Sequence, residues 1–304
     1  MSRYARQICL PGFGEAGQAR LAAARVLVVG AGGLGAGVLP PLVAAGVGHL
    51  RLVDPDVVEE SNLHRQTLFR MSDLGRPKVE AAATALAGLN PDCTISALVA
   101  RLDPATAGVE LEGADLVLDA ADSFATSYAL SDLCRATGTP LISASVLERQ
   151  GYVGGFCGGA PSLRAVFPDL PGRMGDCATN GVMGPVVATL GALQAQMALA
   201  VLLGQQPSPL GQMLTLDLAN WRLGGFRFDG AEEPEIATPE IVSPGQIRPE
   251  DLVVDLRAGD VAEVLPAAGQ RVVFLCVSGL RAWRAARALA ARGHPQVAIV
   301  GVGG

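Results

Sequence analysis

The amino-acid sequence predicts an α/β fold with a doubly wound, mainly parallel sheet, because of its first strand, the turn after it and the alternation that follows. Residues 26–29 form a β-branched run, and residues 30–35 form a glycine-rich turn before an apolar helix that extends to about residue 45. A strand, such a turn and a helix in this order open doubly wound sheets. The βα alternation that follows places helices on both faces of the sheet.

Further elements of this sheet follow in chain order. The sequence predicts strands at residues 49–53, 94–99, 115–119 and 140–145, and helices at residues 77–89 and 123–136. After residue 150 we expect an antiparallel extension, with strand-like runs at residues 152–157, 212–217 and 221–228. Residues 158–181 are expected to form a long loop of the kind that is usually functional. The uncharged segment at residues 178–216 is interrupted by Pro185 and Gly191, which favours a buried helix over a membrane span.

Length and composition fit two domains. The chain has 304 residues, of which 50% are hydrophobic and 17% are charged, so it can bury a large core. The net charge of -6 argues against nucleic acid or an anionic membrane as a partner, since both need clustered cations. The N-terminus has no long apolar segment and the 6 cysteines form no C-x-x-C pair. We therefore expect a cytoplasmic protein without a disulfide framework.

The chain divides into two predicted domains and a linker. Residues 1–229 form the larger domain, and residues 230–240 lie in an acidic, proline-containing stretch that suits an exposed linker. Residues 241–304 form a second, small α/β unit. Its strands are expected at residues 252–255 and 272–276 and its helix at residues 280–292.

The glycine-rich turn is a candidate phosphate-binding loop. Its glycines Gly30, Gly32, Gly33 and Gly35 let a phosphate approach the backbone at a helix N-terminus. Asp54 ends the next strand, where an acidic residue binds ribose hydroxyls in Rossmann-like folds. These features alone favour an NAD-dependent dehydrogenase as much as a mononucleotide-binding enzyme.

A polar series after this strand separates the two alternatives. It consists of Asp56, Asn62, Arg65, Gln66 and the single lysine of the chain, Lys78. A guanidinium and an ammonium at this place would neutralise a triphosphate better than the pyrophosphate of a dinucleotide, so we expect ATP.

A carboxylate after the strand at residues 115–119 is a candidate Mg²⁺ ligand. Asp122 lies where a carboxylate could hold a magnesium ion that bridges phosphates. The structural alternatives are that Asp122 caps the following helix and that Lys78 is a solvated helix residue.

Six ordered motifs resemble the ThiF/MoeB/HesA family, the prokaryotic relatives of ubiquitin-activating enzymes. They are RYARQ at residues 3–7, GAGGLG at 30–35, DPD at 54–56, SNLHRQT at 61–67, GRPK at 75–78 and LDAAD at 118–122. The resemblance covers roughly residues 3–228. It implies that a homodimer uses ATP and Mg²⁺ to adenylylate the C-terminal glycine carboxylate of a ubiquitin-like sulfur-carrier protein ending in Gly-Gly, with release of pyrophosphate.

The family pattern assigns roles residue by residue. Asp54 would bind the ribose, Asp122 would bind Mg²⁺, and the phosphates would be bound by Asn62, Arg65 and Lys78. The protein would mainly position groups and neutralise charge. No general base is needed, because the attacking carboxylate is already ionised near pH 7.

Two further residues take roles from the resemblance alone. Arg6 would reach the phosphates from the partner subunit. Cys177, in the long loop, resembles a family cysteine that takes part in thioester or disulfide chemistry after adenylylation. A loop cysteine without a reaction is the alternative.

The sequence departs from the family at its zinc site. Family members often bind structural zinc with two C-x-x-C pairs, one before the long loop and one near the end of the domain. Residues 161–165 and 226–235 contain no cysteine here. We therefore predict no zinc, and expect packing or dimer contacts to order the loop instead.

The small C-terminal unit resembles a short rhodanese-like domain. Cys276 starts the segment CVSGLR between a predicted strand and a helix, where backbone N–H groups and the helix N-terminus stabilise a thiolate or persulfide. The resemblance implies that Cys276 carries sulfur to the adenylylated carrier, with a cysteine desulfurase as sulfur donor. A degenerate docking unit is the alternative.

We therefore expect a sulfur-carrier adenylyltransferase of a thiamine, molybdopterin or related pathway. The alternatives are an NAD-dependent oxidoreductase and a non-catalytic scaffold of sulfur transfer. Retention of Arg6, Lys78 and Asp122 argues against the scaffold.

Overall fold

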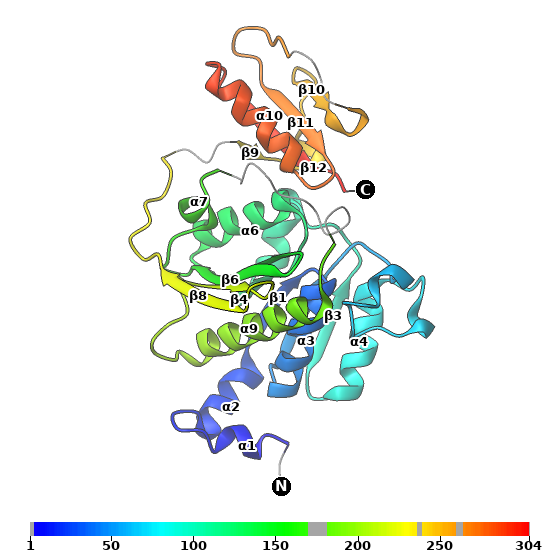
Figure 1. Ribbon diagram of the computed structural model, residues 1–304, viewed down its shortest axis with the longest axis vertical. Coiled ribbons are helices and arrows are strands. Elements are labelled where there is room, and N and C mark those ends of the chain that lie inside the picture. Colours follow the sequence, from blue (N-terminus) through cyan, green and yellow to red (C-terminus); the bar gives the residue numbers. More distant parts are fainter. Residues whose placement is uncertain (1–2, 170–180, 236–238, 260–263, 304) are drawn as a thin grey trace.

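The computed structural model describes residues 3–169, 181–235, 239–259 and 264–303. These residues form a large α/β domain and a smaller α/β unit that packs against it (Figure 1).

Within the described residues, the main sheet has 8 strands in the order β3-β2-β1-β4-β5-β6-β7-β8. They are β1 (Arg25–Val29), β2 (His49–Val53), β3 (Thr94–Leu98), β4 (Leu116–Asp119), β5 (Pro140–Leu147), β6 (Gln150–Cys157), β7 (Gln212–Asp217) and β8 (Arg222–Arg227). The first five strands pair in parallel, and β6, β7 and β8 extend the sheet antiparallel. The predicted α/β fold with a doubly wound, mainly parallel sheet and an antiparallel extension is confirmed.

Helices cover both faces of this sheet. One face carries α3 (Gly33–Ala45), α4 (Lys78–Leu89) and α9 (Gly184–Leu203), and the other carries α5 (Pro104–Leu111) and α6 (Phe124–Thr137). Side chains of β1 alternate between the two faces. Val26 and Val28 pack in the core under α3, α4 and α9, and Leu27 and Val29 pack in the core under α5 and α6. Figure 1 shows α6 and α9 on opposite sides of β6.

The apolar helix α9 belongs to the core of the large domain. Among the described residues it is the one helix long and apolar enough to cross a membrane by length and composition. It packs along α3, and its fully buried Gln194 donates from Nε2 to the backbone oxygens of Asp119 (2.7 Å) and Ile142 (3.1 Å). These contacts fasten α9 to β4 and β5, as expected for a buried helix.

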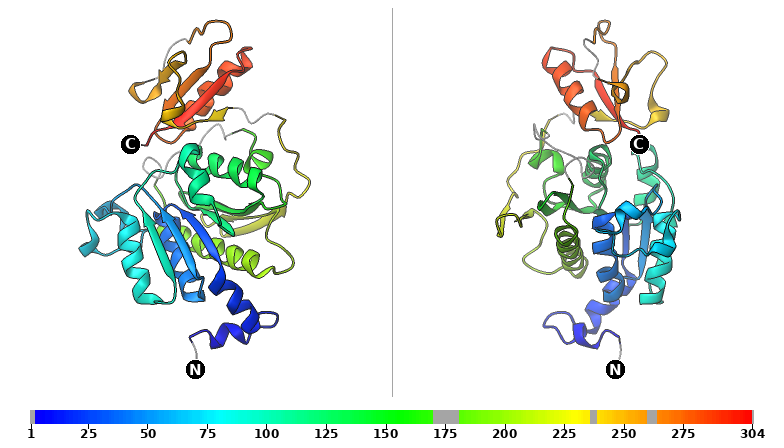
Figure 2. Two further views of the ribbon diagram at one scale, coloured as in Figure 1. Left: turned by 180° about the vertical axis from the view of Figure 1, so that it is seen from behind. Right: turned by 45° about the vertical axis from the view of Figure 1, so that its right-hand side comes forward.

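In the part of the smaller unit that the structure describes, 4 strands form a parallel sheet in the order β10-β11-β12-β9. The strands are β9 (Glu240–Ile241), β10 (Leu252–Asp255), β11 (Val272–Cys276) and β12 (Val297–Gly301), and α10 (Leu280–Ala291) packs on them. Figure 2 shows this unit at the end of the molecule opposite the N-terminus. The predicted domain bounds stay a prediction.

Several elements were not predicted. The pattern analysis misses α5, β9 and β12, and it places one long loop where α7 (Leu163–Val166) forms a short helix. The loop prediction is wrong at α7 because Ser162 caps a turn there, its Oγ accepting from Ala165 N–H at 3.3 Å.

Candidate functional site

The glycine turn between β1 and α3 is closely packed at three of its four glycines. A Cβ atom on Gly30 (φ +102°) would lie 2.4 Å from the backbone oxygen of Ala120, and one on Gly35 would lie 2.4 Å from Gly30 O. A Cβ atom on Gly33 would lie 2.7 Å from Val187 in α9. These three glycines are therefore required by packing within the protein.

Gly32 differs from the other three. The nearest atom to a Cβ atom built on it is Gln66 Nε2, at 3.7 Å. Gly32 is also the N-cap residue of α3, whose first N–H groups lack partners within the helix. Of the four predicted phosphate-binding glycines, this one leaves room for a ligand at the helix start.

Asp54 ties the end of β2 to the glycine turn. Its side chain is 6% exposed, and its Oδ2 accepts from Ala31 N–H (2.7 Å) while Oδ1 accepts from Asp56 N–H (2.8 Å). Burial raises the pKa of Asp54, and the charge of Lys78 and these two N–H groups oppose that rise. A carboxylate held in this way keeps acceptor sites for the hydroxyls of a ribose.

Lys78 is buried at the first position of α4. The Lys78 side chain is 8% exposed, and its Nζ lies 2.8 Å from Oδ2 of Asp56, whose side chain is 51% exposed. A bridge between Val57 and Pro77 brings the two segments together, and Lys78 N–H donates to Asp56 O at 2.9 Å. The alternative that Lys78 is a solvated helix residue is therefore wrong.

The segment around η1 (Glu60–Asn62) places Arg65 and Gln66 over the start of α3. Arg65 Cγ lies 3.6 Å from the Cβ position of Gly33, and Nη1 donates to Ser61 O (3.2 Å) and His64 Nε2 (2.8 Å). Gln66 is 3% exposed, and its buried Oε1 has no hydrogen-bond partner. A buried acceptor without a partner is costly, so a donor from a ligand would be favourable here.

Asn62 completes this segment. It is buried and donates from Nδ2 to Ser61 Oγ at 3.2 Å. Three predicted features therefore lie together: Asp54 after β2, the polar series and the glycine turn. They lie at the carboxyl ends of the parallel strands, where such sheets bind ligands.

Two carboxylates at the end of β4 differ in environment. Asp119 is 1% exposed and accepts from Ser143 Oγ at 2.7 Å, and burial raises its pKa to about 6. Asp122 is exposed. The N-cap of α6 is Ser123, whose Oγ accepts from Thr126 N–H at 3.4 Å, so the alternative of an Asp122 cap is wrong.

Asp122 alone does not make a metal site. The described residues contain no group of three or more His, Cys, Asp or Glu that could hold a metal ion. A carboxylate oxygen suits Mg²⁺, which commonly completes its coordination with substrate phosphates and water. Asp122 fits a magnesium ion that arrives with a nucleotide.

Arg6 lies far from this site within one chain. It belongs to α1 (Ala5–Ile8), whose N-cap residue Tyr4 packs against Gly46 at the end of α3 and accepts from Asn90 at the end of α4. Lys78 is at the opposite end of α4, which has 12 residues and is about 18 Å long. Cys177 lies outside the described residues.

Cys276 ends β11 in the small unit. Its Sγ accepts from Ala282 N–H in the first turn of α10 at 3.3 Å, and the residue is 3% exposed. The predicted placement at a helix N-terminus therefore agrees with the structure, and the thiol is covered.

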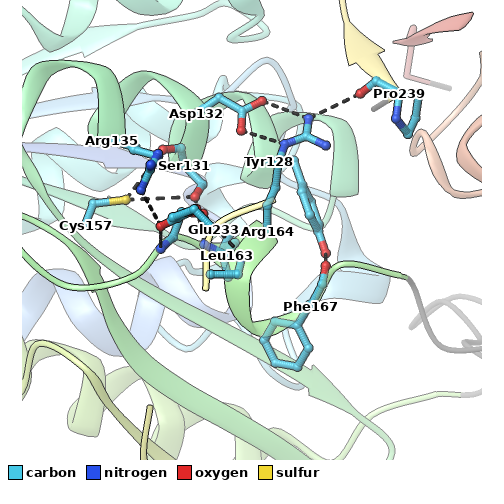
Figure 3. A network of polar contacts seen from close by, with 12 residues as sticks. Tyr128, Ser131, Asp132, Arg135, Cys157, Leu163, Arg164, Phe167, Glu233 and Pro239 are labelled. Atoms are coloured by element: carbon cyan, nitrogen blue, oxygen red, sulfur yellow. Dashed lines mark hydrogen bonds and ion pairs between the residues drawn. The ribbon is translucent and has the colours of Figure 1, made fainter. Parts of the chain in front are cut away.

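Glu233 joins two segments in which this sequence has no cysteine, residues 161–165 and 226–235. The N–H and Oγ of Ser162 donate to the Glu233 carboxylate at 2.7 and 2.6 Å, and Arg135 Nη1 lies 2.5 Å from Glu233 Oε1 (Figure 3). Hydrogen bonds thus fasten residues 162 and 233 together, while the absence of zinc and the ordering of the long loop stay predictions.

Comparisons with known proteins give a consistent result. A model of the ThiF family matches residues 4–235. The SAMP-activating enzyme E1 of Haloferax volcanii is 42% identical over 219 residues, covering 71% of this chain and 81% of the relative. The adenylyltransferase and sulfurtransferase MOCS3 of Bos taurus is 46% identical, covering 74% of this chain and 50% of the relative.

UBA4 of Yarrowia lipolytica, also named an adenylyltransferase and sulfurtransferase, is 42% identical and covers 66% of this chain and 52% of its own length. The chain thus spans about half the length of UBA4 and MOCS3. Among solved structures, the microcin C7 biosynthetic enzyme MccB in complex with N-formylated MccA aligns over 78% of this chain and 74% of MccB, with a TM-score of 0.67 at 22% identity. That likeness shows the fold alone.

Proposed function

The chain belongs to the ThiF family, and on this premise we propose that it adenylylates the C-terminal glycine carboxylate of a ubiquitin-like sulfur-carrier protein, consuming ATP and releasing pyrophosphate. The prediction of an adenylyltransferase that activates ubiquitin-like proteins is confirmed by its named relatives. Use of ATP follows from that family. The individual residues that carry the reaction are our proposal.

One observation carries the assignment of the site: the single lysine of the chain is buried next to the glycine turn. The buried Lys78 ammonium contacts the half-exposed carboxylate of Asp56. Because that side of the ion pair faces solvent, a phosphate group can approach there and the ammonium can neutralise its charge. Arg65 and Asn62 lie at the same strand ends and would bind the remaining phosphate oxygens. Asp54 would bind the ribose, and the unpaired Gln66 Oε1 would accept from the nucleotide.

The reaction needs positioning rather than proton transfer. The carrier carboxylate attacks the α-phosphorus of ATP in line, a C–O–P linkage forms, and pyrophosphate leaves with the electron pair of the broken P–O bond. Lys78 and Arg65 stabilise the charge that develops on the phosphate oxygens. Asp122 would hold Mg²⁺, which supplies further neutralisation of that charge when bound.

The proposed enzyme is a homodimer, because Arg6 lies about a helix length from Lys78 in its own chain. Arg6 would reach the phosphates of the partner subunit. This assignment rests on the family pattern at residues 3–7.

Sulfur transfer is the second part of the proposal. Cys276 would carry a persulfide received from a cysteine desulfurase, and its terminal sulfur would attack the carbonyl carbon of the acyl adenylate as AMP leaves. Cys177 would act as a nucleophile in the thioester or disulfide chemistry that follows. The carrier would belong to a thiamine, molybdopterin or related pathway, in the cytoplasm.

Carrier-dependent ATP–pyrophosphate exchange tests the adenylylation. Purified protein is mixed with labelled pyrophosphate, ATP, Mg²⁺ and a Gly-Gly-ended carrier, and a carrier without its last glycine is the control. We expect label in ATP only with the intact carrier. NAD binding without exchange would instead support the dehydrogenase alternative.

A further inference from the structure

The loop that follows Cys276 caps a helix of the other domain. Ser278 O accepts hydrogen bonds from Ala125 N–H (3.2 Å) and from Ser123 Oγ (3.3 Å) at the start of α6. N–H groups in the first turn of a helix have no partner within the helix, so Ser278 supplies one across the domain boundary.

Two glycines make this contact close. A Cβ atom built on Gly279 would lie 2.8 Å from Ala125 Cβ, and one built on Gly301 would lie 2.7 Å from the same atom. Ala125 is itself 5% exposed. The contact between α6 and the loop therefore has no room for a side chain at residue 279 or residue 301.

A buried arginine makes further contacts at the interface between the large domain and the small unit. Arg164 is 4% exposed and makes two hydrogen bonds to the Asp132 carboxylate (2.7 and 2.8 Å) and one to Pro239 O at 3.3 Å (Figure 3). Its guanidinium carbon lies 5.4 Å from the ring centroid of Tyr128 in α6 and 5.2 Å from that of Trp283 in α10.

The two rings are 4.7 Å apart, so Arg164, Tyr128 and Trp283 form one cluster across the domain boundary. Such a cluster combines cation–π contacts, ring packing and a paired buried charge. Separating the domains would expose Arg164 and both rings to water. We call these three residues the Arg164 clamp.

These contacts bear on Cys276, which directly precedes the docked loop. Cys276 is 3% exposed, and its backbone O accepts from Val302 N–H at 3.0 Å. A thiol reacts as a thiolate that reagents can reach, so a covered thiol reacts only from conformations that open.

We propose that the start of α6 is a docking surface for the Cys276 loop, and that the Arg164 clamp keeps this loop docked and so controls access to the Cys276 thiol. This inference goes beyond the proposed function, because it holds whether or not Cys276 carries a persulfide. The surface begins one residue after Asp122. Release of the loop would therefore open Cys276 beside the candidate nucleotide site.

Site-resolved alkylation tests this control of access. The full chain is treated with N-ethylmaleimide, and mass spectrometry measures the alkylation rates of Cys276 and of the exposed Cys9. The rate of each cysteine in the native protein is divided by its rate in the protein unfolded by guanidinium chloride. We expect Cys276 in the native protein to react at least about tenfold more slowly than Cys9 on this scale.

The variant Ala125→Gln places a larger side chain against Gly279 and Gly301 without altering the core of the small unit. We expect it to raise the Cys276 rate at least about tenfold and to leave the Cys9 rate unchanged. Ala136→Gln, on an exposed position of the same helix, is the matched control and should change neither rate.

Arg164→Gln tests the clamp independently and should raise the Cys276 rate in the same direction. Circular dichroism establishes that each variant is folded. The proposal is overturned if native Cys276 reacts as fast as Cys9, or if both folded variants leave its rate unchanged. Neither result depends on adenylylation, so a failure of the proposed function would be seen separately in the exchange assay.

Discussion

Lys78 Nζ lies 2.8 Å from Asp56 Oδ2, and this ion pair joins the first residue of α4 to the loop after β2. The two partners differ in exposure, 8% for the lysine side chain and 51% for the aspartate side chain. The ammonium is thus fixed inside the protein while its counter-ion faces solvent. That arrangement leaves the cation in place for a second, more highly charged anion.

Replacing Lys78 should therefore impair adenylylation. Lys78→Ala is expected to lower carrier-dependent ATP–pyrophosphate exchange at least about tenfold, which is about 1.4 kcal/mol of transition-state stabilisation. Glu80→Ala, an exposed residue of the same helix turn, is the control and should retain exchange. Near-normal exchange in Lys78→Ala would refute the role of this residue.

Asp122 should matter for activity but not for stability. Since Ser123 caps α6 and Asp122 is exposed, Asp122→Ala is expected to change the free energy of unfolding by less than about 0.5 kcal/mol. The same variant should lower exchange at least about tenfold. Urea unfolding and the exchange assay measure the two effects. A destabilised variant, or one with normal exchange at limiting Mg²⁺, would contradict the assignment.

The two proposed reactions should separate at Cys276. Cys276→Ser is expected to retain carrier-dependent exchange and to lose persulfide formation, because the sulfur lies in the small unit and the residues proposed to bind the nucleotide lie at the main sheet. The measurements are the exchange assay and mass spectrometry of the protein after incubation with a cysteine desulfurase and cysteine, since the desulfurase persulfide transfers its outer sulfur to the Cys276 thiolate. Loss of both activities would mean that the two domains do not act separately.

Asp119 should make stability depend on pH in a defined window. Burial raises its pKa from 3.8 to about 6, so between these values the folded state binds a proton that the unfolded state does not. The contribution of protonated Asp119 to stability is therefore fully present below pH 3.8, and it is lost as the pH rises from 3.8 through about 6.

The variant Asp119→Asn removes this titration and keeps an oxygen to accept from Ser143 Oγ. Compared with the variant, the native chain should lose roughly 1 to 3 kcal/mol of stability between the bottom and the top of the window. Urea unfolding at several pH values measures the difference. A difference that does not change with pH would show that Asp119 is not the titrating group.

Glu233 should contribute to stability through Ser162. Ser162 is 1% exposed, and Glu233→Ala would leave its N–H and Oγ without their acceptors, at a cost of about 1 to 3 kcal/mol. Glu232→Ala, an exposed neighbour, should cost less than about 0.5 kcal/mol. Thermal unfolding compares the two, and equal melting temperatures would exclude a structural role for Glu233.

The strands and helices of the main sheet were largely predictable. Val26, Leu27, Val28 and Val29 are all apolar because β1 is buried on both faces, and such a run is visible in the sequence. The glycine turn and Asp54 were found in the same way, since each lies next to such a strand. The elements β9 and β12 were missed because each depends on pairing with a strand distant in the chain.

The Arg164 clamp had no signal in the sequence. An arginine in a polar, glycine-rich segment is typical of an exposed loop, and neither Asp132 nor Pro239 is near it in the chain, at separations of 32 and 75 residues. The sequence pattern likewise predicts only that Trp283 is one apolar residue of an amphipathic helix. Its contact with Tyr128 exists only because the two domains pack together.

The sequence by itself determined the sheet, the glycine turn and the family, because these depend on residue types at short, regular spacings. Tertiary structure alone decided that Lys78 is buried against Asp56, that Ser123 rather than Asp122 caps α6, and that the loop after Cys276 docks on this helix. The physical reason is that burial and hydrogen-bond partners are properties of segments brought together by folding, and local periodicity does not encode which segments those are.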